Sequence, residues 1–273
     1  MRRTFEQSLK SAKVNPKKEY SKLFELFYRK DERDGKSLAD LISLNFEGFY
    51  FRGTCLDLEE FDEEYGFRFV EQPQNFDIDH LISFCEYIYN FVLYFEDRFF
   101  FGQINKHFYL QHINKVIDAL NYVQRSEDGI TIFVPRDNVA LSVSELEQIP
   151  ENVSHKILTY HHHSMKGNIE AKKATLIILA SQLEPQEKVL SQIDGSFKSD
   201  LFYAFNNLNI RHNNVDPSDK RYYKKVVAEM DAEELEHWYD ETYQMCLLAF
   251  MRLEQKDRKK KFDDVKSKIE AKE

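Results

Sequence analysis

The chain has 273 residues, 42% of them hydrophobic, and contains only 8 Gly and 6 Pro. This composition excludes a low-complexity or collagen-like protein and favours helices, because the residues that interrupt helices are scarce. The formal net charge of −9, from 38 basic and 47 acidic side chains, excludes a surface that is basic overall, although a local basic cleft would still bind the phosphates of RNA. Composition and charge are therefore compatible with a small-molecule enzyme, a protein-binding module or a specialised nuclease.

The expected location of the protein is the cytoplasm, without membrane contact. The longest apolar stretches of the sequence are too short to cross a bilayer. The arginines at positions 2 and 3 are not followed by the apolar core of a signal peptide. Cys55, Cys85 and Cys246 are odd in number and widely spaced, which argues against a disulfide framework or a four-thiolate zinc site and for a reducing compartment.

Residues 1–140 are predicted to form an N-terminal α+β domain. Its first periodic segment, from Tyr20 to Tyr28, has aromatic and leucine side chains at helical spacing and predicts a short amphipathic helix. Residues 46–70 contain three glycines and alternate locally between apolar and polar side chains, which predicts short strands or ordered loops. Within them, the six carboxylates of residues 57–64 would suit a cation or a basic partner, but they are more typical of a solvated loop.

The rest of this domain is predicted to contain two helices and a strand. Apolar side chains recur at spacings of three and four over residues 78–97, with Asp77 as a candidate cap, and again over residues 104–123. Residues 129–135 are rich in β-branched side chains and predict a strand. Residues 136–150 have mixed character, and we place the domain boundary there.

Residues 150–255 are predicted to be wholly helical. One long helix is expected over residues 153–183, and Ser196 is a candidate cap for the next. A helix beginning at Asp231 follows, with Trp238 among the side chains at its buried spacing. Residues 256–273 are strongly charged and are expected to form a frayed, solvated tail. The predicted fold class is therefore mainly α with a minor β component.

The polar cluster at residues 206–214 is the most informative feature for chemistry. If the helix before it continues, Asn207, Arg211 and Asn214 share one face. The guanidinium of Arg211 has the planar geometry that matches phosphate, and the imidazole of His212 transfers protons near neutral pH. The alternative is structural, with these side chains satisfying the carbonyl groups at a helix end, and spacing alone favours it.

Other clusters are more typical of structural or solvated positions. Consecutive histidines at 161–163 point about 100° apart on a helix, so they do not converge on one metal ion. The sequence has no paired cysteine spacing, no His-Glu-x-x-His motif and no glycine-rich phosphate loop. We therefore expect neither a metal site nor a bound cofactor, and nucleotide-driven motors are disfavoured.

The residues IRHNN at 210–214 and WYDETYQMCLLA at 238–249 give the C-terminal region a resemblance to the HEPN-type helical domain of AbiJ-like abortive-infection proteins. The resemblance implies a small helical bundle, commonly dimeric, that often acts as a metal-independent ribonuclease. Arg211 matches the arginine of the family motif, and His212 fits the polar position that follows it. The later histidine of the motif is absent, since Asp216, Pro217 and Ser218 occupy its place.

Two functions follow from this resemblance. In the first, the protein is an anti-phage effector that cleaves RNA, with tRNA among the candidate substrates, and leaves 2′,3′-cyclic phosphate ends. Arg211 and His212 are then catalytic, and Asn207, Asn213 and Asn214 bind the substrate. In the second, the domain is a non-catalytic dimerisation or binding module that senses a nucleotide or a phage component. A homodimer is expected, together with a neutralising or phage protein as partner.

Overall fold

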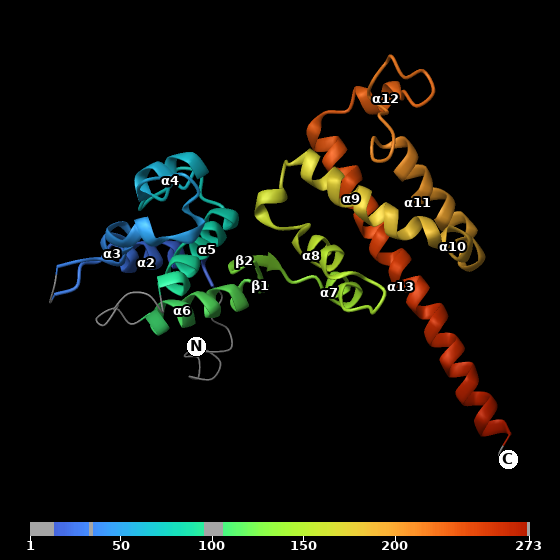
Figure 1. Cartoon of the computed structure of the whole chain (residues 1–273), viewed down its shortest axis with the longest axis horizontal. Helices are drawn as coiled ribbons and strands as arrows, with labels where there is room; N and C mark the ends of the chain where they lie inside the picture. The colour runs from blue at the N-terminus through green and yellow to red at the C-terminus, as the bar shows by residue number, and fades with distance from the viewer. Residues whose placement is uncertain (1–13, 33–34, 96–105, 272–273) are drawn as a thin grey trace, which may run out of the picture. The chain divides into compact units, whose positions relative to one another are not determined.

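The computed structural model of the chain describes residues 14–32, 35–95 and 106–271 (Figure 1). The chain divides into two compact units, residues 1–135 and 136–273. Most of the described residues are helical, and two strands form one antiparallel sheet. The predicted fold class, mainly α with a minor β component, is therefore confirmed. The division falls at the start of residues 136–150, in which we had placed the domain boundary.

The first unit is a helical assembly with one hairpin. Short 3-10 turns at Phe46–Gly48 and Tyr50–Arg52 lie between the helices Leu38–Asn45 and Leu58–Tyr65. Its regular elements are α2 (Pro16–Tyr28), α3 (Leu38–Asn45), α4 (Leu58–Tyr65), α5 (Ile78–Phe95), α6 (Lys106–Ala119), β1 (Tyr122–Glu127) and β2 (Ile130–Pro135).

Helix α5 is the centre of this unit because it is apolar around most of its circumference. Helices α2 and α6 and strand β2 all pack against it. Aromatic side chains are prominent in the packing around α5: the ring centroids of Tyr20 in α2 and Phe84 lie 5.3 Å apart, and those of Phe49, from the turns before α4, and Phe91 lie 4.6 Å apart. Such ring pairs contribute stability beyond the area that they bury. The helices predicted near residues 20–28 and 78–97 are confirmed.

Residues 46–70 differ from the prediction, because they form turns and a helix where strands or loops were expected. Asp57 caps α4 by accepting a hydrogen bond from the Glu60 amide at 2.9 Å, and Gly66 ends it with a left-handed φ of 72°. Phe61 is the buried residue of this helix, while most of its carboxylates face water. The helix is only two turns long, so its sequence is too short to show helical periodicity.

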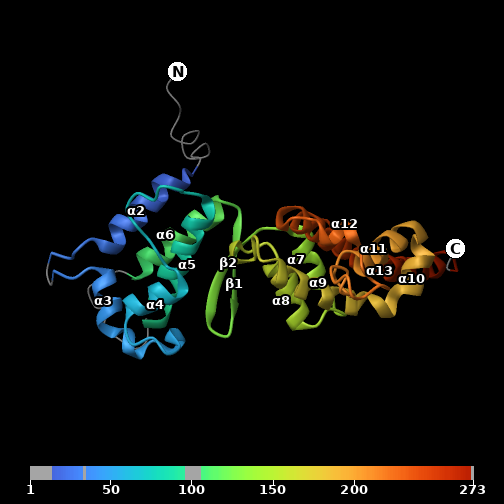
Figure 2. The ribbon, with the colours of Figure 1, turned by 90° about the horizontal axis from the view of Figure 1, so that it is seen from above.

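The strand predicted at residues 129–135 is confirmed as β2, which pairs with β1 in antiparallel register from Tyr122 opposite Pro135 to Glu127 opposite Ile130. Asp128 and Gly129 connect the strands with φ of 51° and 82°, as a tight hairpin turn requires. Figure 2 shows the hairpin most openly. The helix predicted over residues 104–123 ends at Ala119 instead, and the polar strand β1 was missed.

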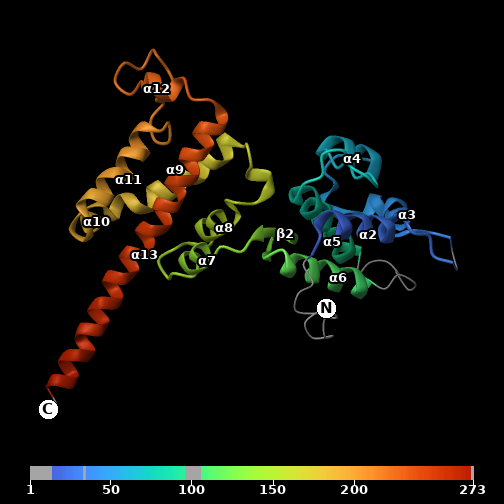
Figure 3. The same ribbon diagram turned by 180° about the vertical axis from the view of Figure 1, so that it is seen from behind.

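The second unit is a bundle in which α13 passes alongside α9, as Figures 1 and 3 both show. Helix α13 also contacts α7, α10 and α11, and it buries Tyr239, Tyr243, Cys246, Leu247 and Phe250. The elements of the unit are α7 (Asn138–Ser144), α8 (Glu151–Thr159), α9 (Ile169–Leu183), α10 (Glu187–Ile193), α11 (Gly195–Asn207), α12 (Lys225–Ala228) and α13 (Ala232–Glu270).

The single long helix predicted over residues 153–183 is wrong, since α8 and α9 are separate helices. Gly167 has a left-handed φ of 71°, and the Asn168 side chain caps α9 by accepting from the Ala171 amide at 3.1 Å. Asn168 was expected inside the long helix, whereas it is the N-cap of a new one.

Other helix ends in this unit were predicted with mixed success. Asp231 caps α13 as expected, accepting from the Glu234 amide at 2.8 Å. Asp194, not Ser196, caps α11 by accepting from the Phe197 amide at 3.0 Å. The tail after residue 255 is not frayed: α13 continues through it as an exposed helix to Glu270.

Candidate functional site

The polar cluster at residues 206–214 forms the turn that ends α11. The helix stops at Asn207, and Asn209 adopts a left-handed φ of 58°. Asparagine tolerates this conformation better than most residues. Because residues after Asn207 leave the helix, Asn207, Arg211 and Asn214 do not share a helix face, and that part of the sequence interpretation is corrected.

Asn214 is a structural residue of this turn. Its side chain is fully buried. The carboxamide oxygen accepts from the Asn209 amide at 2.7 Å, and the carboxamide nitrogen donates to the carbonyl oxygens of Asn206 and Tyr222 at 3.1 and 2.7 Å. The backbone carbonyl of Asn214 also accepts from the Lys224 amide at 2.8 Å. Asn214 therefore joins the end of α11 to the segment that leads into α12.

Arg211 is largely enclosed by other side chains, with 17% of its own side chain exposed. Its guanidinium forms an ion pair with Glu184. The guanidinium carbon also lies 5.5 and 5.3 Å from the ring centroids of Phe202 and Phe205, within the range of cation–π attraction. These contacts hold the side chain against the bundle and occupy part of its hydrogen-bonding capacity.

His212 has different neighbours from Arg211. Its imidazole stacks on the Tyr222 ring, with centroids 3.8 Å apart and planes at 12°. The side chain keeps part of its surface exposed, and Asn213 beside it is exposed. The structure thus places Arg211 against α11 aromatics and Glu184, and His212 against the segment before α12.

Asn207 lines a groove of about 620 Å³ between α11, α12 and α13. The groove is mainly apolar, which is typical of ligand sites in proteins. Three of its large side chains are well exposed: Tyr203 at 67%, Val226 at 71% and Trp238 at 42%. Trp238 was predicted to be buried because it follows the helical spacing of the core, so the sequence interpretation missed this groove. The remaining apolar lining comes from Ala204, Leu208, Val227, Met230 and Met245.

Both signs of charge border the groove. Lys224 and Lys225 line it on the α12 side, and Asp200 and Glu241 line it from α11 and α13. The bond from the Lys224 amide to the Asn214 carbonyl sets the position of this lysine. Asn214 is thereby joined through its backbone to the segment that brings Lys224 to the border of the groove.

A second polar cluster lies inside the same unit. Lys172 of α9 is nearly buried, and its ammonium contacts Glu236 at 2.7 Å and Asp240 at 2.6 Å, both from α13. Burial raises the pKa of Glu236, but hydrogen bonds from Lys172 and from the Gly167 amide outweigh it and leave the pKa below its usual value. The lysine thus ties α9 to α13 as an internal ion pair.

The histidines predicted to lie mid-helix fall in the turn after α8. His161 packs its ring edge-on against Tyr243 at 5.2 Å, and burial lowers its pKa. Tyr160 stacks flat on Tyr243 at 4.0 Å between centroids. These contacts indicate a packed aromatic cluster that supports the bundle.

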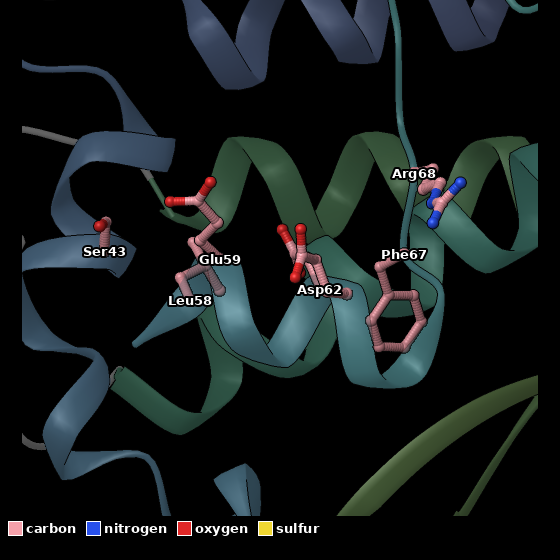
Figure 4. A pocket seen from close by; sticks show the side chains of 7 residues that line it. Ser43, Leu58, Glu59, Asp62, Phe67 and Arg68 are labelled. Carbon is pink, nitrogen blue, oxygen red and sulfur yellow. The ribbon is translucent and has the colours of Figure 1, made fainter. Parts of the chain in front are cut away.

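An acidic hollow of about 300 Å³ lies beside α4 in the first unit (Figure 4). Glu59, Asp62 and Glu63 line it, together with Leu58 and Phe67. Burial raises the pKa of Asp62 to about 6, although a hydrogen bond from Tyr87 opposes the shift. The carboxylates predicted to lie in a loop are therefore fixed on a short helix.

Comparison of the chain with protein-family models, with curated proteins and with solved structures gives no match. The resemblance to HEPN-type domains accordingly stays a prediction. Within residues 14–32, 35–95 and 106–271, no helix combines the length and the apolar character that crossing a bilayer requires.

Proposed function

We propose that the second unit is a non-catalytic binding module whose groove between α11, α12 and α13 takes a nucleotide. The observation that carries this proposal is the exposure of Trp238 and Tyr203 in a groove bordered by Lys224 and Lys225. Apolar walls, aromatic rings and a few charged groups are the usual components of a small-molecule site. In the cell, such a module would serve the abortive-infection role that the sequence resemblance implies.

The chemistry of the groove suits a nucleotide in three respects. The rings of Trp238 and Tyr203 offer surfaces for stacking with a base, which contributes about 1–3 kcal/mol per base in other proteins. The ammonium of Lys224 attracts phosphate as a point charge. The carboxylates of Asp200 and Glu241, which also line the groove, are acceptors for amino groups of a base or hydroxyl groups of a ribose.

The contacts of Arg211 support a binding module over a nuclease. Its guanidinium already pairs with Glu184 and packs against two phenylalanine rings. To clamp a phosphate fully, it would have to exchange these contacts. Asn214, one of the three asparagines predicted to bind the substrate, is fully buried, and its carboxamide is bonded to backbone partners.

Trp238 supplies the direct test, because it is the single tryptophan of the chain. Titration with ATP, and separately with AMP, should change the fluorescence of Trp238 until the groove is saturated. Tyr203→Ala and Lys224→Ala should each weaken binding about tenfold, the loss that follows from about 1.4 kcal/mol. Leu248→Ala and Lys188→Ala, at exposed positions outside the groove lining, should leave the affinity unchanged. Equal affinity in all four variants, or no saturable change, would contradict the proposal.

The second candidate function is the metal-independent ribonuclease. It is favoured by the partial exposure of Arg211 and His212 at adjacent positions of one turn. In this proposal, His212 removes the ribose 2′-hydroxyl proton and Arg211 stabilises the charge that develops on the phosphate. Incubating the protein with total RNA in EDTA should then produce cyclic-phosphate ends, and His212→Gln should abolish them. Cleavage that is equal in folded wild-type and His212→Gln protein would exclude this mechanism.

A further inference from the structure

The last four turns of α13 carry an exposed apolar stripe. Figure 1 shows the helix continuing past the other helices of the second unit. Phe262, Val265 and Ile269 are exposed to 61%, 49% and 57%. Their spacing of three and four residues places them on one face. Large apolar side chains on one face of a helix are typical of a docking surface.

This stripe is not an extension of the face that packs in the bundle. At 100° per residue, it lies about a third of a turn away from the buried side chains of Cys246 and Phe250. Beyond its buried residues, the side of α13 that faces the bundle is polar, and Lys256 and Lys260 lie on that side. The stripe therefore needs a partner other than the core of its own unit.

Cations flank the stripe on both sides. The helical spacing places Lys259 and Lys266 along one border and Lys261 and Lys268 along the other. The ammonium of Lys266 lies 5.0 Å from the centroid of the Phe262 ring, which confirms this arrangement. Among the described residues, none of these four lysines forms an ion pair. Asp263 and Asp264 are within three or four residues of these lysines, but the helical spacing places both aspartates away from the stripe. The borders of the stripe are therefore cationic and predict an anionic partner surface.

The chain itself presents such a surface on α4. Residues 57–64 contain six carboxylates and no cation. Glu59 and Glu63 are exposed and form no ion pair within the described part of the chain. Figure 4 shows Glu59 and Asp62 projecting from successive turns of α4, with Phe67 just beyond the helix. Leu58 and Phe67 add apolar surface to the same hollow of about 300 Å³.

We propose that the end of α13 in one copy of the chain docks against the α4 surface of a second copy. Phe262 enters the hollow over Leu58 and Phe67, and Lys261 and Lys266 face Glu59 and Glu63. Opposite charges around a small apolar contact give specificity and fast association. When both copies make this contact reciprocally, it closes a homodimer whose stability depends on salt.

Charge complementarity selects this occupant over the obvious alternative. Direct pairing of two α13 ends would bring the flanking lysines of one helix against those of the other, because these positions border the seam of a coiled coil. Like charges in that arrangement oppose association. The α4 surface, by contrast, supplies only carboxylates at the positions that would meet the lysines, with Arg68 at the far end of the hollow.

The test is a charge exchange followed by sedimentation equilibrium of the full chain. Wild-type protein should be a dimer that dissociates with rising salt. Lys261→Glu with Lys266→Glu should weaken the dimer about tenfold or more, and so should Glu59→Lys with Glu63→Lys. Combining all four substitutions restores opposite charges at the contact and should recover most of the lost affinity.

A matched control separates this contact from a general effect of charge. Lys256→Glu with Lys260→Glu makes the same change on the other side of α13 and should leave the dimer intact. Circular dichroism of each variant verifies the fold. A wild-type protein that is monomeric at every concentration would overturn the proposal, and so would a dimer whose affinity does not respond to the charge exchanges. A variant with all four substitutions that dimerises more weakly than either double variant would overturn it as well.

Discussion

The hydroxyl group of Tyr87 donates hydrogen bonds to both carboxylate oxygens of Asp62, at 3.0 and 3.2 Å. The bond joins α5 to α4 at Asp62, one of the residues that line the acidic hollow. Burial raises the pKa values of both groups, that of Asp62 to about 6. A carboxylate that must lose its proton in this environment makes the stability of the first unit depend on pH.

Asp62→Asn should remove this dependence. The folded pKa lies above the unfolded value near 3.8, so the folded state retains a proton that the unfolded state has lost between about pH 4 and pH 6. The free energy of unfolding of wild-type protein therefore falls as pH rises through this window. With partial solvent screening, we expect the variant to gain about 1–2 kcal/mol on wild type between pH 4.5 and 7.5. Urea unfolding of both proteins at pH 4.5 and 7.5 measures this difference in the free energy of unfolding. A variant that loses stability relative to wild type as the pH rises would contradict the expectation.

Tyr87→Phe should raise the pKa of Asp62 above 6. The Tyr87 hydroxyl stabilises the charged carboxylate, so its removal leaves the effect of burial unopposed. The pH dependence of the Asp62 side-chain carbon chemical shift measures this pKa directly. Tyr65→Phe on the same helix, where the tyrosine is exposed, is the control and should not move it. A lower pKa in Tyr87→Phe would show that the hydrogen bond has another effect.

Lys172→Met should destabilise the second unit by about 2–4 kcal/mol, because it leaves two carboxylates without their buried partner. The partial exposure of Glu236 and Asp240, at 19% and 36% of their side chains, limits this loss because water screens their charges. Lys188→Met, at an exposed position of α10, should have almost no effect. Chemical unfolding of the two variants gives the comparison, and similar stability in both would mean that the ion pair contributes little.

Asn214→Ala and Asn213→Ala form a matched pair from neighbouring positions. Loss of the Asn214 carboxamide leaves buried backbone groups of Asn206, Asn209 and Tyr222 without their partner, and we expect a loss of about 2–4 kcal/mol. Asn213 is exposed, and its substitution should change stability by less than about 0.5 kcal/mol. Thermal unfolding distinguishes them. A larger effect at position 213 would reverse their assigned roles.

Arg211 and Glu184 should show a small but measurable coupling. The carboxylate is 55% exposed, so we expect an interaction of about 1 kcal/mol or less from a double-mutant cycle with alanine. Arg211→Ala should be the more destabilising single change, because it also removes packing against Phe202 and Phe205. Equal single effects with no coupling would indicate that the guanidinium is free to contact a ligand.

Local patterns predicted the parts of the fold that each segment can specify alone. The apolar periodicity of residues 78–95 identified α5, and the β-branched residues before Pro135 identified β2. The cap at Asp231 was also predicted from its own sequence. Helix α4 and strand β1 were missed because short polar elements take their conformation from the surfaces they cover, which single-sequence patterns do not reveal.

The candidate site could be predicted only in part. Composition and spacing drew attention to the turn at residues 206–214, but they could not show that α11 ends at Asn207 and that Asn214 turns inward. Trp238 matched the spacing of buried residues and is exposed in the groove. Helical spacing identifies residues on one face, whereas the neighbour that covers or uncovers that face comes from a distant part of the chain.

The amino-acid sequence by itself determined that this protein is mainly helical, because scarce helix breakers and apolar periodicity act within a few turns. It also determined the charges of α4 and of the end of α13. The tertiary structure decided which polar side chains are sealed inside and which line a groove. Burial and exposure depend on contacts between residues far apart in the chain, such as Lys172 with Asp240 at 2.6 Å. The sequence of a single segment does not reveal such contacts, because each of them needs a partner from another segment.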